Sequence, residues 1–505
     1  MTAAVAGGLL ATATGRAGSA ATVASPGSID AVAGLTGGRD LWACGWNGQG
    51  VDVALIDTGV TPVSGTGTVV NGPDLSFDAQ TGGQPYLDGF GHGTHLASII
   101  NGHDPGVSVS GACRLLPDGT VASSGVPTAT GYAGVAPGAR VVSIKVGAVD
   151  GAVDVTQVVA AIDWVVAHRN TDGFNIRVLT LAYGVPSTSD TVHDPLSHAV
   201  EIAHRNGIVV VASSGNDGTS HTDLAFPARN PDVIAVGAAD SHGATNAWNW
   251  SIAGFADRGS KDRPVDLVVP GIDVQGLRVP GSYIDSLAPS TSGDRFIRGS
   301  GTSQTTAVVA ALAAQLIQRY PSATADQIKA MLQKGAAPLQ TSGASWSQGS
   351  GGVVARQLLK AAPNNTKTTA LATVGDAPVT ADRQDQSVAL DGVTLTANTD
   401  VQGNPWTTAW ATAASSATSW NLGQWNGHRY SGDTMTTTGW ATATWPTSFA
   451  GTTWSSTGGP GGSWDGLRWN GLRWNGLRWN GVRWNGISWD GLRWNGLRWN
   501  ANTWT

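Results

Sequence analysis

The sequence predicts an α/β fold with helices on both faces of a mainly parallel sheet, in three layers. Between about residues 42 and 362, apolar runs rich in Val and Ile alternate with stretches of helical periodicity. The apolar runs are nearly continuous, which is typical of strands buried on both faces. Each run is bounded by Gly, Pro or Asp, residues that end strands and begin turns.

The elements can be assigned in chain order. Five apolar runs are predicted as strands, at residues 51–57, 139–146, 176–184, 207–215 and 232–239. Helices are predicted between and after them, at residues 154–169, 194–207, 299–320 and 324–335. The last helix has a capping-box pattern, Thr324 with Gln327, and a glycine at its end.

Composition shifts divide the chain into four predicted parts: a signal-like N-terminal segment (1–36), the α/β domain (37–362), a linker and Thr/Ser/Trp-rich segment (363–462), and a pentapeptide-repeat tail (463–505). The region after the α/β domain is expected to be β-rich or of low complexity. The N-terminal segment has an apolar run followed by small residues, as in a signal peptide ending near Ala20 to Ala24, but it lacks a basic start. A flexible Ala/Gly-rich arm is the alternative.

Composition and charge limit the function classes. The chain has 505 residues, 41% of them hydrophobic and only 13% charged, which excludes a solvated disordered chain. The net charge of −6 is too small to indicate a polyanion partner, so no nucleic acid is expected. No apolar run in the body of the chain is long enough to predict a membrane span.

The chain has two cysteines, Cys44 and Cys113. Neither belongs to a CxxC pair, so zinc and redox motifs are not indicated. A disulfide between them, formed in an oxidising compartment, and two buried thiols are both compatible with the sequence.

Four polar residues lie at the ends of predicted strands or at the starts of predicted helices: Asp57, His92, Asn216 and Ser303. Singly, each fits a structural role in a turn or a helix cap. Together they supply the groups of acyl-transfer catalysis, because a serine needs an imidazole to take its proton and the imidazole needs a carboxylate to orient it. An amide can stabilise the oxyanion that forms.

At these residues the sequence resembles the subtilisin-like serine proteases. "VALIDTGV" is similar to the aspartate motif of that family, "GHGTHLASII" to its histidine motif, "ASSGNDG" to its oxyanion segment and "GSGTS" to its serine motif. The order Asp, His, Ser along the chain is also that of subtilisin. The resemblance implies that Asp57, His92 and Ser303 are catalytic, that Asn216 is the oxyanion donor, and that His95 is a structural residue of its helix.

The segment "LTLAYG" is similar to the substrate-binding strand of the family, which pairs with an extended peptide. The resemblance implies two walls around the substrate side chain, formed by Ala182, Tyr183 and Gly184 and by Ser213, Ser214 and Gly215. Ala182 stands where the family commonly has serine. The alternative is that these residues are only part of the sheet core.

The sequence departs from the family pattern in two further places. After the serine the family usually has Met-Ala-x-Pro, whereas this chain has Gln304-Thr305-Thr306-Ala307, which changes helix packing beneath the nucleophile and is expected to reduce turnover. Relatives often bind calcium near a loop that here carries an insertion, residues 101–130. Only Asp74 resembles a calcium ligand, so calcium is left open and no metal or cofactor is predicted.

In the tail, a tryptophan recurs every five residues from Trp464 to Trp504. Tight turns at Asn-Gly would give every indole the same orientation, in a small coil or solenoid. A mobile low-complexity tail is the alternative. Tryptophan with arginine can stack on sugars, nucleobases or cell-wall polymers, and an outward-facing setting favours a glycan or the wall.

The sequence therefore predicts a secreted or cell-surface serine endopeptidase that hydrolyses polypeptides through an acyl-enzyme, with a tail that holds it to a cell-wall polymer or glycan. The alternative is a weakly active or inactive scaffold of the same family that acts as a cell-surface or glycan-binding protein.

Overall fold

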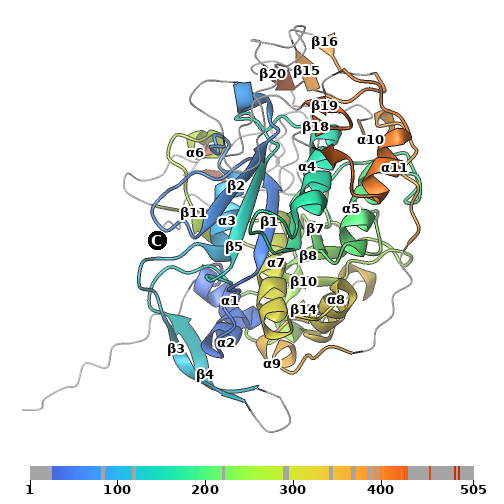
Figure 1. Ribbon diagram of the computed structural model, residues 1–505. Helices are drawn as coiled ribbons and strands as arrows, with labels where there is room; N and C mark the ends of the chain where they lie inside the picture. The colour runs from blue at the N-terminus through green and yellow to red at the C-terminus, as the bar shows by residue number, and fades with distance from the viewer. Residues whose placement is uncertain are drawn as a thin grey trace, which may run out of the picture.

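The structure is a computed structural model of the whole chain (Figure 1). It describes residues 25–80, 86–115, 121–218, 222–287, 295–340, 345–364, 371–383, 388–390, 393–395, 397–401, 403–421 and 424–429, together with the short strands β20 (Trp454–Ser456), β21 (Arg483–Trp484) and β22 (Ile487–Ser488). Within these ranges, no helix is long and apolar enough to cross a membrane.

A ten-stranded sheet forms the centre of the molecule. Its order is β13-β14-β10-β8-β7-β6-β1-β5-β2, with β9 beside β8. The strands are β1 (Asp52–Asp57), β2 (Val69–Asp74), β5 (Arg140–Lys145), β6 (Ile176–Leu181), β7 (Val209–Ser213), β8 (Ile234–Asp240), β9 (Ser251–Ile252), β10 (Leu267–Pro270), β13 (Ala336–Ala337) and β14 (Gly352–Val353). From β2 to β14 all neighbours are parallel, and only β9 and β13 pair antiparallel in this sheet. The predicted mainly parallel sheet is confirmed.

Both faces of the sheet are buried, as the continuous apolar runs predicted. In β1, Val53 and Leu55 belong to one apolar core, while Ala54 and Ile56 belong to the other. The two sets separate because successive side chains of a strand point to opposite faces. Helices must therefore cover the sheet on both sides.

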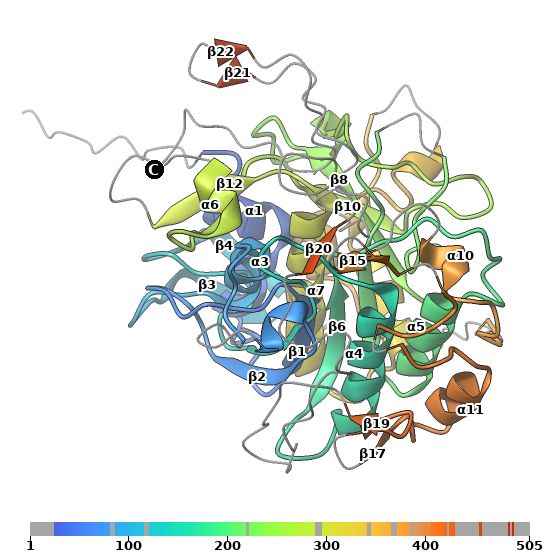
Figure 2. The same cartoon turned by 90° about the horizontal axis from the view of Figure 1, so that it is seen from above.

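One face carries α3 (His92–Asn101) and α7 (Thr302–Arg319), which pack against each other and against the strands. The other face carries α4 (Val155–His168) and α5 (Pro195–Arg205), which pack on β6, β1 and β7 (Figure 2). Further helices and strands of the α/β body are α6 (Tyr283–Leu287), α8 (Ala325–Lys334), α9 (Ala355–Leu358), η1 (Phe77–Gln80), η2 (Ala247–Asn249), η3 (Ser345–Ser347), and the antiparallel pair β11 (Val274–Leu277) and β12 (Phe296–Gly299).

The segment predicted to end at residue 36 contains a helix of the folded body. α1 (Ile29–Thr36) is capped by the Ser28 hydroxyl and buries Ile29 and Val32 in the same core as α7. α2 (Gly38–Ala43) follows at once, and Arg39 pairs with Asp30 at 2.7 Å. This helix was not predicted, because its small residues resemble those of the Ala/Gly-rich stretch before it.

The predicted loop insertion forms a hairpin of β3 (Val109–Leu115) and β4 (Val121–Ala129). Cys44, at the end of α2, is joined to Cys113 of β3 by a disulfide, with the two Cα atoms 4.8 Å apart. Of the two alternatives open from the sequence, the structure has the disulfide, which ties the hairpin to the body.

Part of the predicted linker and Thr/Ser/Trp-rich segment is packed on the α/β body. We call the described residues between 371 and 429 the C-terminal strap. Its elements are α10 (Thr380–Arg383), β15 (Val388–Leu390), β16 (Val393–Thr394), α11 (Ala409–Ser415), β17 (Trp420–Asn421), β18 (Gln424–Trp425) and β19 (His428–Arg429). α11 and β17 lie against α5 and α4 (Figures 1 and 2). Most of the repeat tail lies outside the described residues.

Two polar anchors hold the strap on α4. Asp154, which caps α4, accepts a bidentate pair of bonds from Arg383 at 2.7 and 2.9 Å. Asp163, in the middle of α4, accepts the indole N–H groups of Trp410 and Trp425 on one oxygen, at 2.7 and 2.8 Å. All five side chains are buried, and burial raises the pKa of Asp163 to about 6.

Candidate active site

The predicted catalytic side chains lie at the carboxyl edge of the sheet, where the side chains of parallel α/β proteins meet substrates. Asp57 is the last residue of β1, and Asn216 follows β7; β1 and β7 are the two neighbours of β6. His92 is the first residue of α3, and Ser303 is the second residue of α7. Since α3 packs against α7, the elements that carry all four residues meet here.

Asp57 and His92 form a buried hydrogen-bonded pair. Nδ1 of His92 lies 2.9 Å from Oδ1 and 3.0 Å from Oδ2 of Asp57, and both side chains are 1% exposed. The ionised carboxylate can only accept, so Nδ1 carries the proton. In the neutral imidazole, Nε2 is then the nitrogen that carries the lone pair that a general base needs.

A glycine permits the close approach of α3 to β1. A Cβ atom at residue 93 would lie 2.2 Å from the Gly59 carbonyl oxygen and 3.1 Å from Oδ1 of Asp57. Any larger residue would push the first turn of the helix away from the strand end. Gly93, the glycine of "HGTH", is therefore needed for Asp57 and His92 to come within hydrogen-bond distance of each other.

The Asn216 amide is oriented by the residue that precedes Ser303. Its Oδ1 accepts the backbone N–H of Thr302 at 3.0 Å and the Thr302 hydroxyl at 3.1 Å. These donors fix which end of the amide is oxygen, so Nδ2 points the other way. Nδ2 is buried and has no hydrogen-bond partner among the described residues. The amide can therefore donate to a group that arrives beside Ser303.

Residues beyond the predicted set complete the contact between β1 and α3. The Thr58 hydroxyl accepts the Gly93 N–H at 2.9 Å, and Asp88 accepts the N–H groups of Gly91 and Thr94 at 2.6 and 2.7 Å. The side chain of Lys145 reaches the Thr58 carbonyl at 2.8 Å. Of these residues, only Thr58 could have been suspected from the sequence, because it directly follows Asp57.

The residues that depart from the family pattern are buried in the first turns of α7. The hydroxyls of Thr305 and Thr306 both donate to the Thr302 carbonyl at 2.8 Å. The Gln304 amide lies beside Gly299 of β12, as does Nε2 of His95, and neither amide atom has a hydrogen-bond partner within the described ranges. Burial lowers the pKa of His95 to about 3, with a smaller contribution from His92, so His95 is neutral.

The predicted substrate-binding residues lie at the ends of β6 and β7. Ala182, Tyr183 and Gly184 follow β6, whereas Ser213, Ser214 and Gly215 end or follow β7. The two sets are adjacent because the strands pair. Tyr183 is fully buried, and Asp154 and Arg383 lie within electrostatic range of its hydroxyl. Its side chain therefore belongs to the core beneath the strap; substrate contact by the backbone of these residues stays a prediction.

Asp74, the residue that resembled a calcium ligand, is bonded to its own loop. Its carboxylate accepts the Ser76 N–H and hydroxyl and the Tyr86 N–H, at 3.0, 2.6 and 2.9 Å. Burial raises the pKa of Asp74 to about 6. In the described part of the chain, no cluster of three or more His, Cys, Asp or Glu side chains could hold a metal ion.

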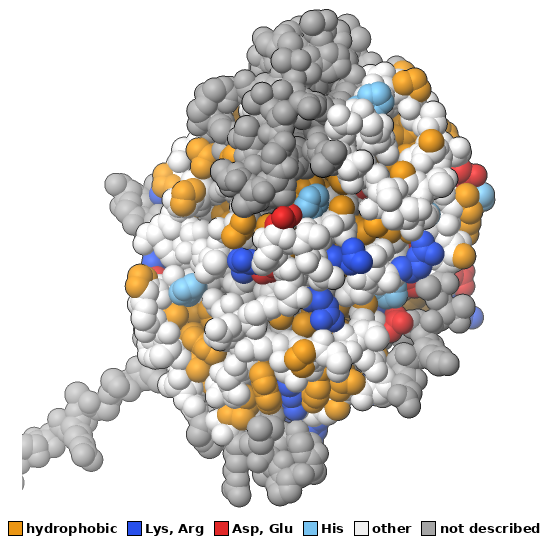
Figure 3. Space-filling model, viewed as in Figure 1, with side chains coloured by type: hydrophobic (Ala, Val, Ile, Leu, Met, Phe, Trp, Pro, Cys, Tyr) orange, Lys and Arg blue, Asp and Glu red, His pale blue; other side chains and the backbone are white. Residues whose placement is uncertain are grey.

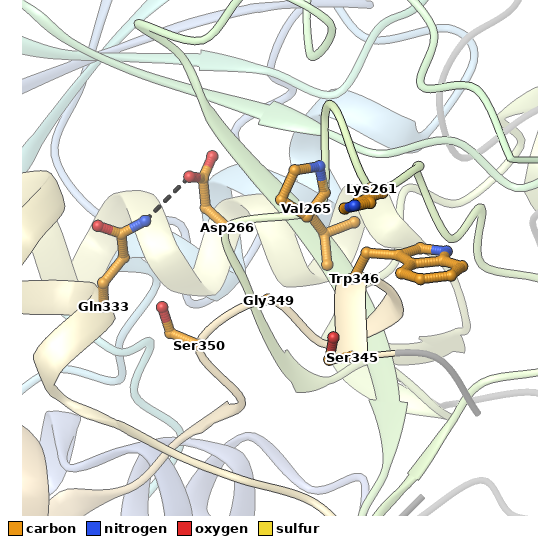
Figure 4. A pocket seen from close by; sticks show the side chains of 9 residues that line it. Lys261, Val265, Asp266, Gln333, Ser345, Trp346, Gly349 and Ser350 are labelled. Carbon is orange, nitrogen blue, oxygen red and sulfur yellow. Dashed lines mark hydrogen bonds between the residues drawn. The ribbon is translucent and has the colours of Figure 1, made fainter. Parts of the chain in front are cut away.

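A cavity of about 280 Å³ lies at the opposite, amino end of the sheet, around Asp266, Gln333 and Trp346 (Figure 4). The Asp266 carboxylate is fully used, since it bonds Gln333 at 3.0 Å and also Lys329, Arg263 and the Ala235 N–H. Of the charged side chains that line this cavity, Asp266 is therefore occupied, and Lys261 is the other. On the face shown in Figure 3, Lys and Arg side chains are scattered and form no continuous basic patch.

Comparisons with known proteins match the α/β body of the chain. The model of the subtilase family matches residues 48–351. Serine protease AprX of Bacillus subtilis (strain 168) is 32% identical over 297 residues, which is 57% of this chain and 61% of AprX. Subtilisin BL of Lederbergia lenta is 32% identical over 299 residues, which is 58% of this chain and 86% of that protein.

The minor extracellular protease Epr of Bacillus subtilis (strain 168) is 28% identical over 305 residues, 60% of this chain and 38% of Epr. The chain thus spans less than two thirds of AprX and of Epr. Because the family match covers more than half of the chain and includes all four predicted site residues, the chain belongs to the subtilase family.

Proposed function

We propose that the chain is a serine endopeptidase in which Ser303 is the nucleophile, His92 the general base and Asp57 the carboxylate that orients it. The observation that carries the proposal is the buried Asp57–His92 hydrogen bond at 2.9 Å, on a helix that packs against the helix of Ser303. The subtilase family and the relatives AprX and subtilisin BL, which are named as proteases, support the same activity.

The proposed chemistry follows from the tautomer. Nε2 of His92 takes the Ser303 hydroxyl proton as Oγ attacks the carbonyl carbon of the peptide bond. The imidazolium that forms is stabilised by Asp57 and then protonates the leaving amine. Water hydrolyses the acyl-enzyme by the same steps in reverse, with His92 again as base. Activity should therefore fall as acid protonates His92.

The oxyanion would be stabilised by the Asn216 amide and by the N-terminus of α7. Nδ2 of Asn216 is a donor already in place, because Thr302 holds the oxygen end of that amide. A preorganised donor costs no reorganisation when charge develops on the carbonyl oxygen. The positive end of the α7 macrodipole acts in the same direction. Polypeptide substrates would lie along the ends of β6 and β7 as an added strand.

Replacing the nucleophile tests the proposal. Ser303→Ala should abolish casein cleavage and labelling by a fluorophosphonate probe while the melting temperature changes little, because only one oxygen is removed. Ser322→Ala, at an exposed serine, is the matched control and should keep both activities. Labelling that persists in Ser303→Ala would contradict the assignment.

The rival function is a weakly active or inactive scaffold that binds a cell surface or glycan. It is favoured by the buried, non-family residues Gln304 to Ala307 and by the tryptophan repeat. The same probe separates the two: an unlabelled wild-type protein that still binds insoluble polysaccharide would establish the scaffold.

We also propose that the protein is secreted and that the tail, residues 463–505, binds a cell-wall polymer or glycan. Nine tryptophans in equivalent positions would make several weak stacking contacts act together. A chain that ends at Gly462 should keep full peptidase activity on short peptides and lose retention on cell-wall material. Unchanged retention of the truncated chain would contradict a binding tail.

A further inference from the structure

Asp88 lies four residues before His92 and is 1% exposed. Its Oδ1 accepts the Gly91 N–H at 2.6 Å and the Thr58 hydroxyl at 2.8 Å, and its Oδ2 accepts the Thr94 N–H at 2.7 Å. The donors Gly91 and Thr94 are at the start of α3, and Thr58 directly follows the last residue of β1. One carboxylate therefore joins the helix that carries His92 to the strand that carries Asp57.

The Thr58 hydroxyl has a single proton and two carboxylates within reach. Its Oγ1 lies 2.8 Å from Oδ1 of Asp88 and 3.2 Å from Oδ1 of Asp57. The shorter contact takes the proton, and the same oxygen accepts the Gly93 N–H. Asp57 then keeps the Thr58 N–H at 2.8 Å and the His92 ring as donors.

We propose that Asp88 is a positioning residue of the catalytic pair: it draws the Thr58 hydroxyl proton away from Asp57, so that Asp57 remains a strong acceptor for His92. The inference rests on the proposed function of Asp57 and His92 and adds a residue outside the triad. Asp88 also adds a negative charge near the imidazolium. Its effect on the charged state of His92 therefore has the same sign as that of Asp57.

Other charged or titratable groups face this pair from the surrounding elements. Asp57 is on β1, the neutral His95 is on α3, and Lys145 of β5 donates to the Thr58 carbonyl at 2.8 Å. Lys145 also contacts Asp78 at 3.1 Å, which offsets part of its charge. Of these groups only Asp57 could accept the Thr58 hydroxyl in place of Asp88. Lys145 only donates, and the His95 ring lies beside Gly276 and Gly299.

The test is the pH profile of kcat/KM for Asp88→Asn in two backgrounds. In the wild-type background, the Thr58 proton can turn to Asp57, so kcat should fall on the order of tenfold with KM little changed. The acid limb should move to lower pH, because the imidazolium loses a nearby negative charge. In a Thr58→Val background the hydroxyl is absent, and Asp88→Asn should displace the acid limb clearly less.

The controls separate this inference from its alternatives. Asp172→Asn, at an exposed aspartate, should leave the profile unchanged. An unmoved acid limb in Asp88→Asn would show a merely structural role, and an equal displacement in both backgrounds would exclude steering of the hydroxyl; either result overturns the proposal. If Asp88→Asn does not fold, Thr58→Val should keep the wild-type acid limb, because in the wild type that hydroxyl donates to Asp88 and not to Asp57. An acid limb that moves to higher pH in Thr58→Val would show that the hydroxyl already donates to Asp57, and would overturn the proposal. A wild-type protein that is not labelled at Ser303 refutes the proposed function instead.

Discussion

The carboxyl edge of the sheet and the outer surface of α4 both bury carboxylates, but with different partners. At the edge, Asp57 is bonded to His92, 35 residues away, within one continuous part of the α/β body. On α4, Asp154 is bonded to Arg383, 229 residues away, and Asp163 is bonded to strap tryptophans about as distant. The carboxylate of Asp57 therefore lies beside a titratable ring, whereas Asp154 and Asp163 accept hydrogen bonds from side chains of the strap.

The difference teaches which interactions should change activity and which should change stability. An aspartate that orients an imidazole stabilises the transition state, so substitutions of the residues around it should lower kcat. A buried ion pair or carboxylate that holds a strap affects the free energy of unfolding, because an unpaired partner is left without water. Variants in the two regions should therefore have separate signatures.

Arg383→Met should have the largest effect on stability. It leaves the Asp154 carboxylate buried without its guanidinium, which costs about 3–5 kcal/mol of unfolding free energy. Urea unfolding measures it. Arg356→Met, at an exposed arginine, should cost nothing measurable, and adding Asp154→Asn to Arg383→Met should restore part of the loss. If the single variant is as stable as wild type, the strap is not anchored there.

Asn216→Ala should have the largest effect on activity. The expected fall in kcat is on the order of 10²–10³, the size measured for the oxyanion donor of subtilisin, with a smaller change in KM. The lost bonds to Thr302 should cost only about 1 kcal/mol of stability. Asn170→Ala, at an exposed site, is the control. A near-normal kcat would exclude the proposed oxyanion donor.

Asp163→Asn should change how stability depends on pH. Burial raises the pKa of Asp163 to about 6, so the folded protein binds this proton more tightly than the unfolded chain does. The free energy of unfolding should then fall as pH rises from about 4 to about 6, by about 3 kcal/mol from this group. An asparagine oxygen can still accept both indoles, so the variant should lack that fall.

Melting temperatures of wild type and Asp163→Asn between pH 4 and pH 7 measure the effect. The two curves should diverge in favour of the variant as pH rises, and Asp172→Asn should follow wild type. Parallel curves for wild type and Asp163→Asn would show that the carboxyl group does not titrate in this range.

The sheet and the four site residues were predictable because they depend on local sequence. β1, β5, β6 and β7 lie within the predicted strands, and β8 extends one residue beyond its predicted end, since continuous apolar runs are typical of strands buried on both faces. Asp57 and His92 stand in short motifs in which neighbouring glycines permit close approach of the backbone. Asp88 was missed because its role depends on where the Thr58 hydroxyl points, which sequence spacing does not show.

The strap and α1 were not predicted, for different reasons. The strap has no helical or alternating periodicity, and its anchors are donors such as Arg383 and Trp410 whose acceptors lie more than 200 residues earlier. α1 is composed largely of residues that also occur in the Ala/Gly-rich stretch before it. Its burial depends on Ile29 and Val32 meeting a core formed by distant helices.

Ser303 is tested most directly as the nucleophile by locating the bond that a fluorophosphonate forms with the protein. The full chain is treated with the probe at neutral pH and at pH 5, digested, and analysed by mass spectrometry. We expect one phosphonyl group, on Ser303, formed faster at neutral pH because His92 must be neutral to accept the hydroxyl proton. An adduct on another residue, or none on a folded chain, would contradict the assignment of Ser303 as the nucleophile.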